Sequence, residues 1–172
     1  MAFNLNTNQR AERKQLITVA EWMEGTTKKT EVLGRRIESS NIDYNHDIST
    51  TTDILGENYT DVNKSQPQQS FEPYTIMGGS ALAEFLNSKR RRNALSELSG
   101  FTLYIITAFK GDPGEYEAER HTDCTIVYNS IGGDSHVDMP ITVYFSNKIT
   151  TGTVDKLDDT FTFSPDGTTT TE

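Results

Sequence analysis

Apolar and polar residues alternate along several segments of the chain, a pattern typical of β-strands with one buried face. In "MPITVYFSN", Ile141, Val143 and Phe145 fall on one strand face, and "DTFTFSP" alternates in the same way. The segment "FTLYIITAFK" is apolar on both faces, as expected of a strand covered on both sides. Further segments rich in β-branched and aromatic residues also predict strands: "QLITVAEWM", "TEVLGRRIES", "NIDYNHDI" and "CTIVYNSI".

One helix is predicted after Ser80, a residue type favoured at the N-cap position. Three apolar residues share one face of this helix: Leu82, Phe85 and Leu86. Leu95 and Leu98 fall on the opposite side, so either the helix breaks near "KRRRN" or its two ends pack against different surfaces. Gly100 is expected to end the helix as its C′ residue.

The elements follow the order of strands, one helix and more strands, without the alternation of a doubly wound α/β sheet. This order predicts a single mainly β domain over residues 1–172, an antiparallel β-sandwich or barrel with one flanking α-helix. Three polar segments extend beyond that core. They are an N-terminal arm (1–14), a long loop (47–74) and a C-terminal tail (164–172).

The composition indicates a protein that completes its structure with neighbouring copies. Only 34% of the 172 residues are hydrophobic and the formal net charge is −9, which leaves little apolar material for a self-sufficient domain. The acidity argues against a surface that grips nucleic-acid phosphates. Cys124 is the only cysteine, so no intramolecular disulfide can form. We expect a soluble intracellular protein without signal peptide or membrane span, because no apolar run is long enough.

No catalytic or metal-binding pattern emerges from the sequence. In "HTDC", a strand would place His121 and Asp123 on one face and Cys124 on the other, so these three residues cannot chelate one metal together without a bulge. His136 lies downstream, and we expect histidines that are exposed or satisfied by other partners. The turn "MGGSA" lacks the Lys-Ser/Thr pair of a P-loop. Ser135 beside His136 has no nucleophile elbow. We therefore expect no enzyme activity, no metal and no cofactor.

Charge is segregated along the chain. Between residues 37 and 63 there is no lysine or arginine, but there are six acids: Glu38, Asp43, Asp47, Asp53, Glu57 and Asp61. Solvated faces and loops are the usual explanation of such a segment. A second explanation is an acidic strand face, made of Asp43, Asn45 and Asp47, that repeats around an axis and lines a pore. DNA would be repelled evenly there and could pass without sticking.

A basic cluster lies near the end of the predicted helix and comprises Lys89, Arg90, Arg91 and Arg92. Such a cluster could bind DNA by itself. It coincides, however, with the point where the helix changes its packing face. We therefore expect these side chains to form salt bridges within a subunit or between subunits.

The features of the chain follow a recognisable order. A polar arm and strands precede the long segment "DILGENYTDVNKSQPQQSFEPYTI" and the helix "SALAEFLNSKRRRNALSEL". "FTLYIITAF", "HTDCTIVYNSIGGD" and "MPITVYFSNKITTGTVD" follow. This order resembles the major tail (tail tube) proteins of long-tailed bacteriophages over most of the chain. The resemblance implies hexameric rings that stack into a tube with a negative lumen, in a virion tail assembled in the host cytoplasm.

The same resemblance implies partners and contacts. The partners would be other copies of the chain, the tape-measure protein and viral DNA in the lumen, and tail-tip and terminator proteins, without a membrane. The long loop would reach neighbouring subunits through residues that include Asp53, Glu57, Tyr59, Asp61 and Phe71. Extended segments of this kind can add strands to a neighbour's sheet edge.

Three alternatives remain open. The chain could form the inner tube of a contractile tail or of a bacteriocin-like injection particle. It could also be a soluble ligand-binding β-barrel, which predicts a stable monomer with an apolar cavity. An enzyme would need His121, Asp123 or His136 to converge, which the expected strand geometry disfavours.

Overall fold

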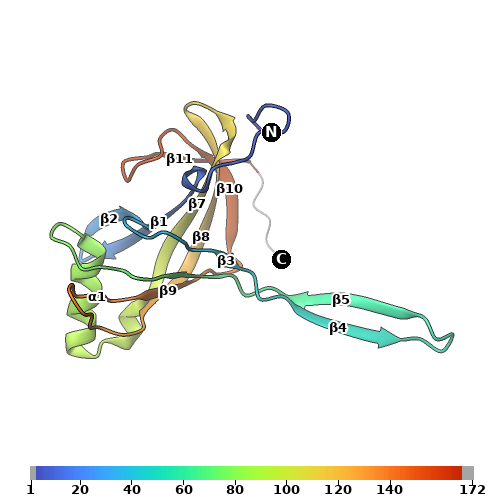
Figure 1. The fold of residues 1–172 in the computed structure, drawn as a ribbon, viewed down its shortest axis with the longest axis horizontal. Coiled ribbons are helices and arrows are strands. Elements are labelled where there is room, and N and C mark those ends of the chain that lie inside the picture. The colour runs from blue at the N-terminus through green and yellow to red at the C-terminus, as the bar shows by residue number, and fades with distance from the viewer. Residues whose placement is uncertain (1–2, 168–172) are drawn as a thin grey trace.

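The computed structural model describes residues 3–167, and within them the fold is mainly β and antiparallel with one α-helix, as predicted (Figure 1). The strands of its nine-stranded sheet are β1 (Leu16–Glu24), β2 (Thr27–Val32), β3 (Ile42–Asp43), β6 (Gln68–Phe71), β7 (Ser99–Asp112), β8 (Glu115–Tyr128), β9 (Ile141–Tyr144), β10 (Ile149–Val154) and β11 (Phe163–Pro165). Their spatial order is β2-β1-β7-β8-β9-β6-β3, and β10 with β11 branches from β8. A separate sheet pairs β4 (Asp47–Thr52) with β5 (Asn58–Lys64).

Strand β8 carries the branch of the sheet. Residues 116–121 pair with β10, whereas residues 125–128 pair with β9. Between these two stretches the register with β7 shifts, and Asp123 adopts a left-handed conformation with φ 58°. A bulge bends a strand and increases its twist. The two halves of β8 therefore run in different directions, so that one half pairs with β10 and the other with β9.

The central strands bury different clusters on their two faces. Ala20 and Leu103 belong to a large cluster that lies beneath the helix α1 (Ala81–Arg92). Their sequence neighbours Val19 and Tyr104 belong to a smaller cluster on the other face, which Val154 completes. The prediction that "FTLYIITAFK" forms a strand covered on both sides is therefore confirmed. The predicted inward face of "MPITVYFSN" is likewise buried.

The helix starts and packs as predicted but ends earlier than expected. Ser80 is the N-cap and its Oγ accepts a hydrogen bond from the backbone N–H of Ala83 at 3.2 Å. The predicted apolar face, Leu82, Phe85 and Leu86, is buried. Asn93 ends the helix in a left-handed conformation with φ 53°, which asparagine tolerates. Gly100 is therefore not the C′ residue: it lies inside β7, beyond the short 3₁₀-helix η2 (Leu95–Leu98).

The carboxylate of Glu31 in β2 fastens the beginning of the helix to the sheet. Its Oε2 accepts a hydrogen bond from the backbone N–H of Leu82 at 3.0 Å. Its Oε1 accepts one from Tyr74 Oη at 3.0 Å and one from Ser80 Oγ at 2.8 Å. A carboxylate at this position also interacts favourably with the positive end of the helix dipole.

Replacing Glu31 with glutamine is expected to lower the free energy of unfolding by about 1–2 kcal/mol, because the amide loses the charge and presents a donor to another N–H. Urea denaturation followed by circular dichroism would measure the change. Glu24→Gln, at an exposed position in β1, is the matched control and should change stability by less than about 0.5 kcal/mol. Equal losses in both variants would contradict the anchoring role of Glu31.

Two of the predicted strands are interrupted. The strand expected in "TEVLGRRIES" stops at Val32, because Gly34 and Arg36 both have positive φ values and turn the chain. "NIDYNHDI" is not one strand either: β3 ends at Asp43, Asn45 is left-handed with φ 45°, and a new strand begins at Asp47. Both errors arise where residues with left-handed backbone break the alternation of faces.

The two ends of the described chain are held differently. Near the N-terminus, Phe3 pairs with Lys110 as an isolated bridge, and Asn4 Nδ2 donates a hydrogen bond to Gly111 O at 2.7 Å. The predicted C-terminal tail begins as β11, which pairs with β10. The remainder of the tail, 168–172, and the first two residues of the N-terminal arm lie outside the described residues. No helix among residues 3–167 has the length and apolar character to cross a membrane.

Candidate assembly interface

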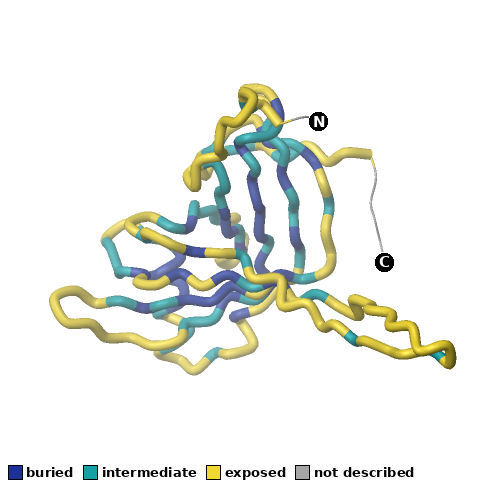
Figure 2. Tube along the Cα trace, turned by 45° about the vertical axis from the view of Figure 1, so that its right-hand side comes forward, coloured by how far each residue is buried: buried dark blue, intermediate teal, exposed yellow. Residues whose placement is uncertain are grey.

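The long loop predicted over residues 47–74 is in fact a projecting ribbon followed by a return into the sheet. Strands β4 and β5 form a two-stranded antiparallel ribbon that extends away from the body (Figure 1) and is exposed along nearly its whole length (Figure 2). At its base, Tyr44 O accepts hydrogen bonds from the backbone N–H of Gln66 and from Ser65 Oγ, both at 2.9 Å. The chain is thus fastened where the ribbon leaves the body. An isolated two-stranded hairpin has little stability in water, so this ribbon has the form of a segment that binds elsewhere.

The two faces of the ribbon differ in charge. The register pairs Ile48 with Val62 and Thr50 with Thr60, and paired residues lie on the same face. Thr52 and Asn58 complete this face, which therefore carries no charge. The opposite face carries Asp61 and Tyr59, paired with Ser49 and Thr51. The uncharged face presents the exposed aliphatic side chains of Ile48 and Val62 to solvent.

The turn that joins the two strands is held by its own hydrogen bonds. Asp53 Oδ1 accepts the backbone N–H of Leu55 at 2.8 Å and that of Glu57 at 3.0 Å, and Tyr59 Oη donates to Asp53 Oδ2 at 3.1 Å. The bond from the Glu57 N–H, together with those from Leu55 and Tyr59, holds the pKa of the Asp53 carboxyl below its usual value. The turn therefore keeps these bonds at neutral pH and loses them only as the pH falls through that lowered pKa. Gly56, with φ 82°, permits the tight return.

This ordered turn holds two aliphatic side chains out in solvent. Ile54 is 102% exposed and Leu55 is 81% exposed. Burial of one such side chain is favourable by roughly 1.5–3 kcal/mol, so a partner that covered both would gain binding energy without having to order the turn. We refer to residues 53–57 as the tip. The charge pattern of the sequence pointed to the acids of the tip but not to its aliphatic pair, although "DILGE" contains both aliphatic residues next to the turn glycine.

Phe71 does not belong to the projecting ribbon. It lies in β6, is only 1% exposed, and packs in the large cluster beneath α1. The assignment of Phe71 to an inter-subunit loop was therefore wrong, because its side chain is already covered by its own chain. The other four residues assigned to the loop, Asp53, Glu57, Tyr59 and Asp61, lie in the ribbon or its turn.

The structure also corrects the geometry expected of the acidic strand face. Asp43 lies in β3 of the main sheet and Asp47 begins β4 of the ribbon. Asn45, between them, has a left-handed backbone, and its Nδ2 donates to Gln66 O at 3.1 Å. The three residues are exposed, but they do not form one strand face.

The basic cluster at the end of α1 is only partly engaged within the chain. Lys89 forms an ion pair with Glu97, and its ammonium lies 4.5 Å from the centroid of the Phe85 ring. Lys89, first through its hydrogen bond, lowers the pKa of the Glu97 carboxyl. Arg90 donates two hydrogen bonds to Asn87 Oδ1. Within residues 3–167, Arg91 and Arg92 take part in no ion pair.

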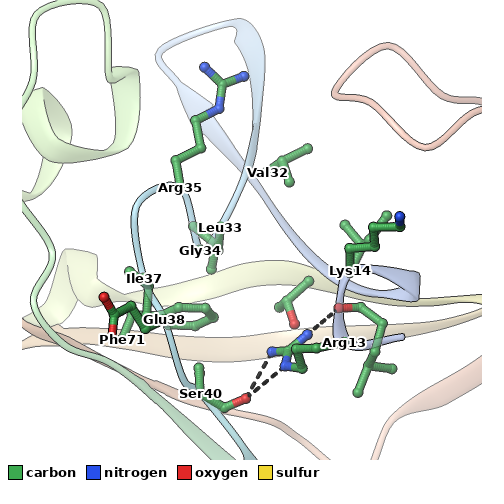
Figure 3. A pocket seen from close by; sticks show the side chains of 13 residues that line it. Arg13, Lys14, Val32, Leu33, Gly34, Arg35, Ile37, Glu38, Ser40 and Phe71 are labelled. Atoms are coloured by element: carbon green, nitrogen blue, oxygen red, sulfur yellow. Dashed lines mark hydrogen bonds between the residues drawn. The ribbon is translucent and has the colours of Figure 1, made fainter. Parts of the chain in front are cut away.

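A cavity of about 470 Å³ opens between η1 (Arg13–Gln15), β1, β2 and the segment that follows β2 (Figure 3). Its apolar wall consists of Leu16, Ile17, Val32, Leu33, Ile37 and Phe71. Its polar rim includes Arg13, Lys14 and Arg35, together with one carboxylate, Glu38. The guanidinium of Arg13 is fixed by Ser40 O, which Nη2 contacts at 2.8 Å, and by Leu16 O (Figure 3).

The residues considered for a metal site take structural positions. His121 is buried; its Nδ1 lies 3.1 Å from Ser146 O and its Nε2 lies 3.3 Å from Glu119 Oε2. The bulge turns Asp123 outward and Cys124 inward, and burial raises the pKa of the Cys124 thiol. His136 is exposed. Among the described residues no cluster of metal-ligating side chains is found.

No family model matches the chain, and no curated protein matches it. One solved structure similar to the chain is described as an extracellular contractile injection system, PVC sheath-tube complex in the extended state. The similarity covers 86% of this chain and 94% of that one, with 14% sequence identity and a TM-score of 0.48.

Proposed function

We propose that this chain is a structural subunit that assembles with copies of itself into a hollow tube of the phage-tail type. The observation that carries the proposal is the β4–β5 ribbon, which projects from the body and exposes an uncharged face and an aliphatic tip. A surface of this kind is costly to leave in water. The order of sequence features that resembles tail tube proteins supports the same function.

The finer features of the proposal follow from that resemblance. We propose hexameric rings that stack along an axis, with an acidic lumen that conducts DNA and contains the tape-measure protein during assembly. Asp43, Asn45 and Asp47 remain candidates for that lumen as exposed individual side chains. The basic cluster 89–92 is proposed to form salt bridges between neighbouring subunits, through Arg91 and Arg92 in particular. The role is structural, without catalysis.

The experiment that tests this function is negative-stain electron microscopy of the purified protein, together with its mass in solution over a range of concentrations. Rings or hollow tubes, with a mass that grows with concentration, are the expected result. A monomer at every concentration that also retains a small molecule in native mass spectrometry would overturn it. That outcome would favour the ligand-binding barrel.

A tube of this kind occurs in two settings, a non-contractile tail and the interior of a contractile sheath. Both demand the same ring and stacking contacts from this chain. A sheath protein that co-purifies with the tube, or a second layer around it in the micrographs, would assign it to the contractile setting.

A further inference from the structure

The tip and the cavity beside η1 have complementary chemistry. The tip presents the aliphatic pair Ile54 and Leu55 between two carboxylates, those of Asp53 and Glu57. The cavity presents an apolar wall beneath a rim with three cations and one carboxylate. An aliphatic side chain that entered the cavity would leave water, while the acids that flank it would remain at the basic rim.

Four other cavities within residues 3–167 suit the tip less well. The cavity on the outer face of α1 is lined only by polar and charged residues, among them Arg91, Arg92 and Glu84. The cavity beside Tyr104 has an aromatic wall, but its two cations, Lys28 and Arg120, are balanced by two acids, Glu21 and Asp159. In the cavity beside Trp22 and in the one beside Ser80, two acids outnumber a single cation. Of these five cavities, the one beside η1 has the largest excess of cations and also an apolar wall.

The tip cannot reach the cavity of its own copy. Strand β4 has six residues, so the ribbon holds the tip roughly 20 Å from its base at 3.3 Å per residue. It does so in a direction that leads away from the body (Figure 1). The tip that occupies the cavity must therefore belong to another molecule. A second copy of this chain fits that role, because residues 47–64 carry four acids and one cation, Lys64, whereas the rim of the cavity is basic.

We propose that the tip of one copy inserts into the cavity beside η1 of a second copy, with Ile54 and Leu55 against the apolar wall and Glu57 beside Arg35. Two different surfaces meet in this contact, so every copy that donates a tip still has an empty cavity to offer. Such heterologous contacts build rings or filaments and do not stop at a dimer. This inference rests on the proposed function and identifies the surface that receives the ribbon.

Disulfide trapping between full-length chains tests the contact. One chain carries Leu55→Cys and the other, with a tag of different size, carries Glu38→Cys at the rim of the cavity. Cys124 is buried and burial raises the pKa of its thiol, so it does not compete. The control replaces Glu38→Cys with Ser88→Cys, an exposed position on α1. The 55–38 heterodimer is expected in about tenfold excess over the 55–88 heterodimer, because docking raises the local concentration of one pair only.

A charge exchange separates the proposed contact from random collision. Arg35→Glu in the chain with Glu38→Cys should reduce trapping, and Glu57→Arg in the chain with Leu55→Cys should restore it. Tubes in the micrographs without preferential 55–38 trapping would overturn the cavity as receptor and leave the proposed function standing. A chain that neither assembles nor traps would overturn both.

Discussion

Removal of the ribbon is expected to abolish assembly and to leave the body folded. In this variant, residues 47–64 are replaced by a short glycine-serine connection, which can close because the backbone N–H of Gln66 already bonds Tyr44 O across the base at 2.9 Å. Neither hydrophobic cluster contains a residue of β4 or β5. The melting temperature should therefore change by only a few degrees, roughly the effect of 1 kcal/mol. Light scattering and electron microscopy should show a monomer at concentrations where the complete chain forms tubes.

The matched control keeps the ribbon and changes only its tip, with Ile54→Ser and Leu55→Ser. The turn retains its hydrogen bonds through Asp53 and Tyr59, so the ribbon stays ordered and loses only apolar surface. If the aliphatic tip carries the contact, this variant should assemble as poorly as the deletion. Normal tubes from the deletion variant would show that the ribbon is not an assembly element.

The sequence predicted the parts of the fold that depend on regular alternation. Strands such as β7 and β9, and the buried face of α1, follow directly from the spacing of their apolar residues. The errors occur where single residues adopt left-handed backbone. Asn45 and Asn93 each end a regular element, and Asp123 forms a bulge inside β8. Asparagine and aspartate also occur widely in strands and loops with an ordinary backbone conformation. Their conformation is decided by tertiary contacts that a single sequence does not encode locally.

The ribbon lies within the segment where the sequence predicts a long loop, but it has a different form. The segment from Asp47 to Lys64 has few apolar residues and lacks the alternation that marks a strand with one buried face, so its sequence predicts a loop. The ribbon instead forms through threonines and cross-strand pairs, and its apolar residues point to solvent. The cavity could not be predicted at all, since it combines residues from three separate parts of the chain, 13–18, 32–40 and Phe71.

The second large effect is expected at Phe71, which ends β6 and packs in the large hydrophobic cluster. Phe71→Ala should lower the free energy of unfolding by about 3–5 kcal/mol, because it removes a fully buried ring and leaves a cavity beneath α1. Ile54→Ala, at a fully exposed position of the tip, should change stability by less than about 0.5 kcal/mol and is the control. Urea denaturation of both variants at a concentration below assembly would measure the difference.

Together these two variants show whether the contact between copies is confined to the ribbon or extends into β6. If only the ribbon makes the contact, Phe71→Ala weakens folding, and any loss of assembly follows from that, whereas Ile54→Ala weakens assembly in a chain of normal stability. The opposite pattern, a stable Phe71→Ala chain that fails to form tubes, would assign Phe71 to the contact surface. That role would come either from its place in the wall of the cavity beside η1 or from a departure of β6 from the sheet when copies associate. The pairing of β6 with β9 along its whole length, from Gln68 opposite Tyr144 to Phe71 opposite Ile141, argues for the first pattern.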